Sequence, residues 1–232
     1  MQLFQSETGY RYNSDTLLLY DFISTFSPKG SLLDVGCGCG ILGLLLKRDF
    51  PLLHVSLLDI QEQNCTIAKA NALHNALTIE SFTCKDFLTH SHTQKYDTIV
   101  SNPPFYHKGV VQSENESLRI SRHSSSLPFE AMAMKASKML SNKGYFTFCY
   151  DAKQIQNILY TLNHVGLNIE YLRCVHTKAD NEATLMLVRA RKNSKTLCNV
   201  LPPLIVGDER GYLPPIEAIF KRANTQSLLW KA

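Results

Sequence analysis

An Asn-Pro-Pro-Phe sequence follows directly on an apolar run, residues 96–100, that has the length of a β-strand. Pro103 and Pro104 lack N–H donors and have φ fixed at about −65°, so the chain can neither extend the strand nor begin a helix there. The sequence therefore predicts a stiff corner that displays the amide of Asn102 and free carbonyl groups beside the ring of Phe105. Such a corner could receive a planar group that carries an NH2. An Asn-Pro sequence alone more often marks a rigid surface turn, which is the alternative.

A glycine-rich turn separates the predicted strand 31–35 from the predicted helix 41–48. Its sequence, Asp-Val-Gly-Cys-Gly-Cys-Gly, permits unusual φ angles and lets a ligand approach the backbone closely. The spacing of Gly36, Gly38 and Gly40 is not GxGxxG, and no Gly-Lys-Ser or Gly-Lys-Thr follows. Dinucleotide and nucleoside-triphosphate sites are therefore disfavoured. The first turn of an open parallel sheet also binds other adenosine compounds, and a tight turn without a ligand is the alternative.

Two carboxyl groups follow the next two predicted strands. Asp59 ends the strand 54–59, at a distance from the glycines that suits hydrogen bonds to two ribose hydroxyls. Asp86 follows the strand 79–84, where a carboxyl or backbone group can meet the edge of an adenine. Each aspartate could instead cap the helix or turn that it precedes, and both readings stay open.

Strand-length apolar segments alternate with segments of helical period along most of the chain. Besides those already given, we expect strands at 96–101, 145–150, 168–175 and 183–189, and helices beginning near Asn13, Glu62, Pro128 and Lys153. This order predicts an α/β fold with a mostly parallel sheet that has helices on both faces. The last two strands are joined by a short connection, which predicts an antiparallel hairpin at one end of the sheet.

Residues 105–127 do not fit this alternation of strands and helices, since they have no clear hydrophobic period and are rich in Ser, Glu, Arg and His. We expect a functional loop there, and a solvated loop with scattered charge is the alternative. The chain divides into an N-terminal segment with its helix at 1–30, a core at 31–190 and a C-terminal extension at 191–232. The extension opens on the basic run 191–195, which could contact RNA or be a solvated strand end.

Composition bounds the class of protein. The 232 residues carry a formal net charge of +4, which permits a polyanionic partner without requiring one. The seven cysteines include no CxxC pair and the eight histidines show no metal-ligand spacing, so we expect no metal site and a reducing cytoplasmic setting. Cys37 and Cys39 are expected to be small fillers of the turn. We identify no signal peptide and no apolar run long enough to span a membrane.

Taken in order, the glycine-rich turn, the two aspartates and the Asn-Pro-Pro-Phe corner resemble the motifs of S-adenosylmethionine-dependent methyltransferases that act on amino or amide nitrogen. The resemblance covers about residues 10–190 and implies a Rossmann-like class I fold with a seven-stranded sheet. Within that group, the segments 9–19, 101–106, 119–123 and 204–212 resemble the tRNA1(Val) (adenine-37-N6)-methyltransferases. These last correspondences are looser than the core motifs.

The resemblance also implies roles for individual residues. The cofactor S-adenosyl-L-methionine would contact Tyr12, Asp34, Gly36, Cys37, Gly38, Gly40, Asp59, Ile60, Asp86, Phe87 and Asn102. The catalytic corner would comprise Asn102, Pro103, Pro104 and Phe105, and substrate binding would use Tyr106, Lys108, Arg119 and Arg122. In this scheme Asp34 fixes the turn, Asp59 holds the ribose and Asp86 faces the adenine.

The implied reaction is methyl transfer to the N6 amino group of an adenine in structured RNA, with A37 in the anticodon loop of tRNA1Val as the first candidate. RNA is thus the expected partner, without a membrane or an obligate protein partner. A glutamine N5-methyltransferase acting on a protein such as a release factor is the main rival, but it would be expected to carry a helical N-terminal domain. Methylation of adenine in rRNA or DNA, and a non-catalytic RNA-binding module, are further alternatives.

Overall fold

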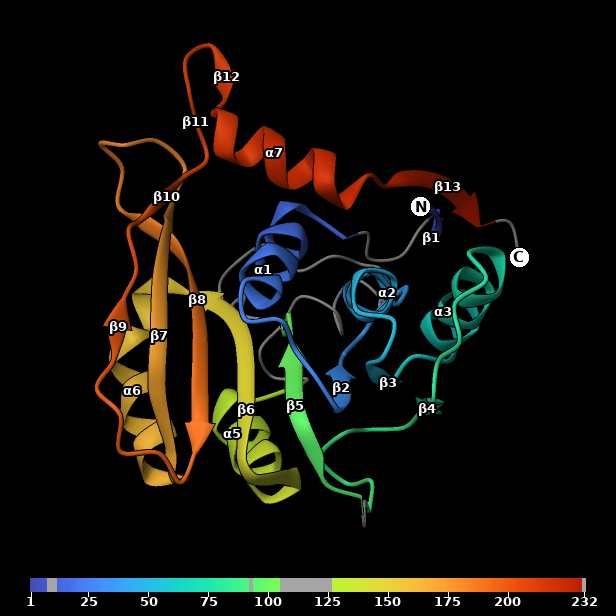
Figure 1. The fold of residues 1–232 in the computed structure, drawn as a ribbon, viewed down its shortest axis with the longest axis horizontal. Coiled ribbons are helices and arrows are strands. Elements are labelled where there is room, and N and C mark those ends of the chain that lie inside the picture. The colour runs from blue at the N-terminus through green and yellow to red at the C-terminus, as the bar shows by residue number, and fades with distance from the viewer. Residues whose placement is uncertain (8–11, 92–93, 105–126, 231–232) are drawn as a thin grey trace.

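The computed structural model describes residues 1–7, 12–91, 94–104 and 127–230. The strands of its main sheet are β2 (Ser31–Val35), β3 (His54–Asp59), β4 (Ser81–Cys84), β5 (Tyr96–Ser101), β6 (Leu140–Asp151), β7 (Leu167–His176), β8 (Ala183–Lys192), β9 (Asn199–Val200) and β10 (Leu204–Ile205). Their order across the sheet is β10-β7-β8-β6-β5-β2-β3-β4, and β9 also pairs with β7 (Figure 1).

The strands β2 to β6 run parallel, and β8 is antiparallel to both of its neighbours, β6 and β7. The predicted seven-stranded, mostly parallel sheet with a final antiparallel hairpin is therefore confirmed. The hairpin returns inward, since β8 lies between β6 and β7. The C-terminal extension adds β9 and β10, which both pair in parallel with β7.

Helices cover both faces of the sheet, as the sequence predicts (Figure 1). They are α1 (Ser14–Ser24), α2 (Ile41–Asp49) and α3 (Glu62–His74) on one face, and α5 (Phe129–Met139) and α6 (Ile155–His164) on the other. Strand β2 shows why both faces must be covered: Leu32 packs into the α1–α2 side of the core and its neighbour Leu33 into the α5–α6 side. Within the described residues, no helix is both long and apolar enough to cross a membrane.

The two ends of the chain form a structure that the sequence did not predict. Strand β1 (Gln2–Ser6) pairs in parallel with β13 (Gln226–Trp230) to make a separate two-stranded sheet. The side chain of Asn71 on α3 accepts from the backbone N–H of Phe4 at 2.6 Å and donates to its carbonyl at 3.0 Å, so it continues the hydrogen bonding of β1. The same side chain donates to the carbonyl of Cys39 at 2.9 Å, which joins the paired ends to the glycine-rich turn.

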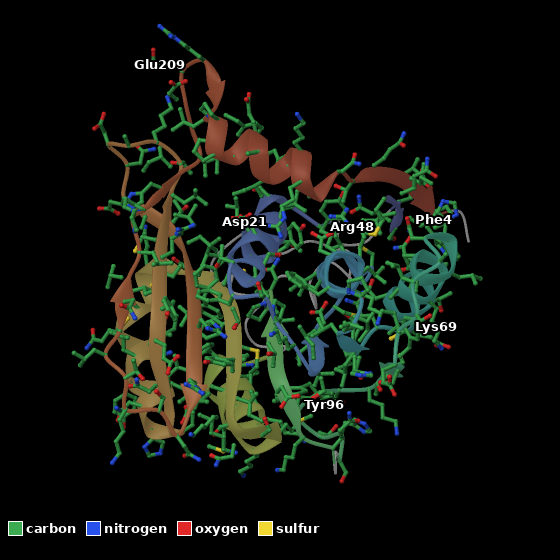
Figure 2. The ribbon with its side chains drawn as sticks, viewed as in Figure 1. Phe4, Asp21, Arg48, Lys69, Tyr96 and Glu209 are labelled. Atoms are coloured by element: carbon green, nitrogen blue, oxygen red, sulfur yellow. The ribbon has the colours of Figure 1, made fainter. Side chains whose placement is uncertain are left out.

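Helix α7 (Pro214–Ala223) packs across α1 and α2 before the chain reaches β13 (Figure 1). Arg48 on α2 donates to the last carbonyls of α7, at 2.6 Å to Ala223 and 3.0 Å to Arg222. Arg222 forms an ion pair with Asp21 on α1 at 3.3 Å. Figure 2 shows Asp21 and Arg48 beneath α7, and Phe4 close to β13. A short hairpin of β11 (Gly207–Asp208) and β12 (Gly211–Tyr212) precedes α7.

Candidate active site

A cleft opens where β2, β3 and β5 end, because the carboxyl ends of parallel strands meet at one edge of the sheet. Its empty volume, open solvent included, is about 600 Å³. Eight predicted residues line it: Gly36, Gly38, Asp59, Ile60, Asp86, Phe87, Asn102 and Pro104. An adjoining hollow shares Gly36, Gly38 and Asn102 with the cleft and is lined also by the predicted residues Tyr12, Asp34 and Cys37.

The glycine-rich turn presents bare backbone to the cleft. Gly36 and Gly38 have φ of +68° and +55°, and a Cβ atom at either position would meet nothing within 4 Å. The turn is held in place by the backbone N–H of Gly36, which donates to the carbonyl of Leu58 on β3 at 2.8 Å. A ligand can therefore lie directly against the peptide groups, a position that a side chain would occupy.

Gly40 has a different role. It does not line either hollow and is the N-cap of α2 with φ of +84°, where a Cβ atom would press on Ala68 and Leu57 at 3.2 Å. Close packing and backbone conformation both require glycine there. The structure thus separates two open glycines from a packed one, although all three stand in the same sequence motif.

Asp34 ties the end of β2 to the first turn of α2. Its Oδ2 accepts from the backbone N–H of Gly43 at 3.0 Å, and the side chain is only 1% exposed. Burial raises the pKa of Asp34 to about 7, the Gly43 hydrogen bond lowers it, and the nearby Asp59 charge raises it further. The residue is thus placed to fix the turn.

Asp59 organises the floor of the cleft. Its Oδ2 accepts from the N–H of Gly38 at 2.8 Å, and its Oδ1 accepts from the N–H of Gln61 at 2.9 Å and from the amide of Asn64 at 3.1 Å. Burial raises the pKa of Asp59, and these hydrogen bonds act against that rise. The carboxylate both caps the following turn and lines the cleft. The cap and the ligand-facing position, which the sequence analysis gave as alternatives for Asp59, are therefore compatible.

An apolar wall and a carboxyl group lie beyond Asp59. Ile60 is 50% exposed and Phe87 is buried, and both line the cleft together with Asp86. Asp86 accepts from the N–H of Leu88 at 2.9 Å, which is the capping alternative, while the residue still lines the cleft. Apolar surface beside a polar edge suits a flat heteroaromatic ring.

The Asn-Pro-Pro corner closes the opposite end of the cleft. Asn102 is half-buried and lines both hollows, Pro104 lines the cleft, and Pro103 is buried. The amide of Asn102 donates from Nδ2 to the hydroxyl of Thr16 at 2.8 Å, and its Oδ1 accepts from the thiol of Cys149 at 3.0 Å. The corner therefore presents an amide whose two ends are already held by neighbouring elements.

Tyr12 lines the hollow next to the glycine-rich turn. Its hydroxyl donates to Thr225 at 3.1 Å and lies 3.3 Å from the hydroxyl of Ser227, and its backbone N–H donates to the Gln5 side chain at 3.0 Å. These partners belong to the paired ends of the chain. The N- and C-terminal segments thus position a residue of the candidate site.

Several predicted residues fall outside the described part of the chain. They are Phe105, Tyr106, Lys108, Arg119 and Arg122. Among the described residues, no group of three or more His, Cys, Asp or Glu side chains could hold a metal ion. Cys37 and Cys39 are both buried, and burial raises the pKa of each thiol, of Cys39 to about 12, so neither is activated.

The sequence analysis missed four residues of this region. Gln61 and Asn64 follow Asp59 so closely that an aspartate ending a strand before a helix could have suggested them as its partners. Thr16 and Cys149 had no such signal, because they are 86 and 47 residues from Asn102 in the sequence.

The order of the sheet, the bare glycine turn and the buried acid that ends the next strand define an S-adenosyl-L-methionine-dependent methyltransferase of the Rossmann-like class I fold. The residues present fit that cofactor. Open backbone at Gly36 and Gly38 would take its methionine part, Asp59 its ribose, and the wall at Ile60 and Phe87 its adenine. The activity of the protein is therefore methyl transfer.

The chain belongs to the methyltransferase small domain family, whose model matches residues 13–154. A tRNA1(Val) (adenine(37)-N6)-methyltransferase of Pedobacter heparinus is 30% identical over 177 residues, covering 75% of this chain and 74% of that protein. The Vibrio cholerae protein of the same name is 24% identical over 88% of this chain and 84% of its own length.

A solved structure from Agrobacterium tumefaciens, described as a predicted O-methyltransferase, is similar in fold. It superimposes with a TM-score of 0.69 at 16% identity, covering 92% of this chain and 99% of its own. At that identity the likeness concerns the fold alone.

Proposed function

We propose that this protein methylates the N6 amino group of an adenine in structured RNA, and that its substrate is A37 in the anticodon loop of a tRNA1Val. The observation that carries the proposal is the position of Asn102, which lines both the cleft and the hollow beside the glycine-rich turn. An amide at that junction suits a planar amino group. The tRNA1(Val) adenine-37 activity named for the two relatives supports the choice of RNA.

The chemistry requires positioning more than a strong base. The lone pair of an adenine N6 amino group is delocalised into the ring, so the nitrogen is a poor nucleophile. When bound, S-adenosyl-L-methionine supplies an electrophilic methyl group on a sulfonium. Asn102 Oδ1 and the carbonyl of Pro103 would accept both N–H groups, orient the nitrogen and stabilise the positive charge that develops on it.

The segment after the corner would complete substrate binding. Phe105 or Tyr106 would stack on the extruded base, as flat pockets for flipped bases do. Lys108, Arg119 and Arg122 would contact phosphates, which makes the affinity for RNA depend on salt. Because tRNA is modified where it is made and used, we propose the cytoplasm as the place of action.

The test is a transfer assay followed by nucleoside mass spectrometry. The purified full chain is incubated with S-adenosyl-L-methionine and a tRNA1Val transcript, with an otherwise identical transcript that carries G37 as the matched control. We expect N6-methyladenosine in the first RNA and none in the second. Equal methylation of both transcripts would reject position 37.

The rival substrates are tested in the same assay. Release factor, 16S and 23S rRNA and duplex DNA each replace the tRNA. Methylation of the release factor on glutamine, or of another nucleic acid with tRNA left unmodified, would overturn the proposal. Cofactor binding by calorimetry without turnover on any of these would mean that the substrate lies outside these classes, and would overturn the proposal.

A further inference from the structure

The amide of Asn102 is held at both ends by side chains to which the sequence analysis assigned no role. Thr16, on the first turn of α1, takes the Nδ2 hydrogen at 2.8 Å, and Cys149, on β6, places its thiol 3.0 Å from Oδ1. Thr16 is 4% exposed and Cys149 is fully buried, so water does not compete for these hydrogen bonds. Both contacts converge on the side chain that stands at the junction of the two hollows.

The orientation of this amide decides whether it can work as an acceptor. An asparagine side chain has nearly the same shape when its oxygen and nitrogen are exchanged, but only the oxygen accepts a hydrogen bond. In the exchanged orientation, the NH2 group would point its hydrogens at a target amino group, which is itself a donor. An unheld amide would therefore spend part of its time in a form that repels the substrate.

The thiol of Cys149 breaks this symmetry. A threonine hydroxyl can either donate or accept, so Thr16 alone would tolerate both orientations. Sulfur is a weaker hydrogen-bond acceptor than a hydroxyl oxygen, so the thiol facing the amide favours the orientation in which it donates to Oδ1. Burial raises the pKa of Cys149 well above its usual value and the charge of Asp15 raises it further, so the thiol keeps its proton and remains a donor.

We infer that Thr16 and Cys149 are positioning residues that hold Asn102 with Oδ1 as the acceptor for the reacting amino group. Thr16 accepts a hydrogen bond from Nδ2, and the Cys149 thiol donates one to Oδ1. The thiol uses one lone pair of Oδ1, so the other lone pair is left for the substrate. This inference rests on the proposed function, because the acceptor matters only if the substrate carries an NH2.

The test compares variants that remove or keep each hydrogen-bonding group. T16V and C149A remove the group with little change of shape, and T16S and C149S keep a hydroxyl donor. At saturating cofactor, we expect kcat for tRNA methylation to fall about five- to tenfold in T16V and C149A, the effect of one net hydrogen bond. T16S should recover most of that loss, whereas C149S should recover only part of it, because a serine hydroxyl can also accept and so tolerates both orientations of the amide. The cofactor Kd from calorimetry should stay near the wild-type value in all four.

A double-mutant cycle separates positioning from a general effect on the fold. In an N102A background there is no amide left to orient, so T16V should cause no further loss of kcat. A loss that multiplies with that of N102A, or unchanged kcat in both T16V and C149A, would overturn the inference. Thermal melting of each variant checks that it is folded under assay conditions.

A second readout does not depend on activity. NMR of the Asn102 side-chain amide should show one slowly exchanging proton in the wild type, since that proton is bonded to Thr16, and the protection should vanish in T16V. Equal exchange in both proteins would reject the inference even if the wild type methylates tRNA. If the wild type methylates no RNA but the protection is present, the proposed function fails and the held amide stands.

Discussion

Two polar clusters line the same cleft, at the ends of the two strands that flank β2, and they are assembled differently. Asp59 at the end of β3 binds Gly38, Gln61 and Asn64, which lie 21, 2 and 5 residues away in the sequence. Asn102 at the end of β5 binds Thr16 and Cys149, which are 86 and 47 residues away. The first cluster forms within β2, β3, the turns that follow them and the start of α3. The second requires α1, β5 and β6 to be in place.

A transferase must bind its cofactor and must also position its substrate, and the two clusters suit these two tasks differently. A cofactor that is common to a whole class of enzymes can be held by a local cluster around one turn and one strand end. The acceptor end must suit a particular substrate, and here it draws on distant elements whose residues can vary separately. We therefore expect substitutions in the Asp59 cluster to affect cofactor affinity, and substitutions in the Asn102 cluster to affect turnover.

The strongest test of this division is N102A. We expect kcat to fall about 100-fold or more, the effect of losing one preorganised hydrogen-bonding group from an active site, while cofactor affinity is nearly unchanged. Calorimetry measures the affinity and a tRNA methylation assay measures kcat. If binding and turnover were both unaffected, the assigned role of Asn102 would be wrong.

The converse test is D59N, for which we expect cofactor affinity to fall about 10- to 100-fold with kcat retained at saturating cofactor. The variant would lose the charge-assisted hydrogen bonds proposed to the ribose, and it presents an NH2 group either to the N–H of Gly38 or to that of Gln61. E62Q is the matched control, because Glu62 is an exposed neighbour of the same charge. A D59N enzyme with normal affinity and reduced kcat would contradict the division between the two clusters.

The same contrast explains what the sequence could predict. The glycine turn, the acids that end β3 and follow β4, and the proline corner are each encoded within a few residues, and those described reach the cleft or its turn, except for the buried Pro103. Seven strands of the sheet followed from hydrophobic pattern, because apolar runs bounded by turns are local signals. That β8 returns between β6 and β7 is set by pairing, which periodicity does not encode.

The pairing of the two ends of the chain could not be predicted from local sequence patterns. Strands β1 and β13 are short and partly polar; each is stabilised by the other, and β1 also by side chains of α3. The N-terminal ammonium of Met1 donates to the carbonyl of Asn224, 223 residues away, at 2.6 Å. No pattern in either segment indicates its partner, so neither the pairing nor its link to Tyr12 could be predicted.

Asp34, at the end of β2, should give a smaller effect that depends on pH. Its carboxyl group has a pKa of about 7 in the folded protein against about 3.9 when unfolded, so between these values the folded state binds a proton that the unfolded state releases. Stability should therefore fall as pH rises through this window, by about 1.4 kcal/mol per pH unit at most. D34N keeps an acceptor for Gly43 and should lose this dependence.

Urea denaturation of wild type and D34N from pH 4.5 to 7.5 measures the difference, which should grow in favour of D34N as pH rises. D97N is the control, since hydrogen bonds from Ser31 and Ser141 lower the pKa of Asp97 against its desolvation. The stability that the Asp97 carboxylate contributes is complete above its unfolded pKa of about 3.9 and is lost only at lower pH, so the penalty of D97N should stay constant from pH 4.5 to 7.5. Parallel curves for wild type and D34N would refute the raised pKa.

The smallest effect concerns Tyr12, which joins the paired ends to the cofactor side of the site. Y12F removes a hydroxyl that is 3.1 Å from Thr225 and 3.3 Å from Ser227, and we expect the cofactor Kd to rise about two- to tenfold, the effect of one net hydrogen bond. The double variant T225V/S227A removes the same contacts, and also the hydrogen bond from Gln5 to Ser227 at 2.6 Å, without changing the lining of the hollow. If the ends of the chain position Tyr12, the double variant should weaken cofactor binding at least as much as Y12F. If cofactor affinity fell in Y12F but stayed normal in T225V/S227A, the Tyr12 hydroxyl would act on the cofactor directly. The paired ends of the chain would then contribute nothing to cofactor binding through Tyr12.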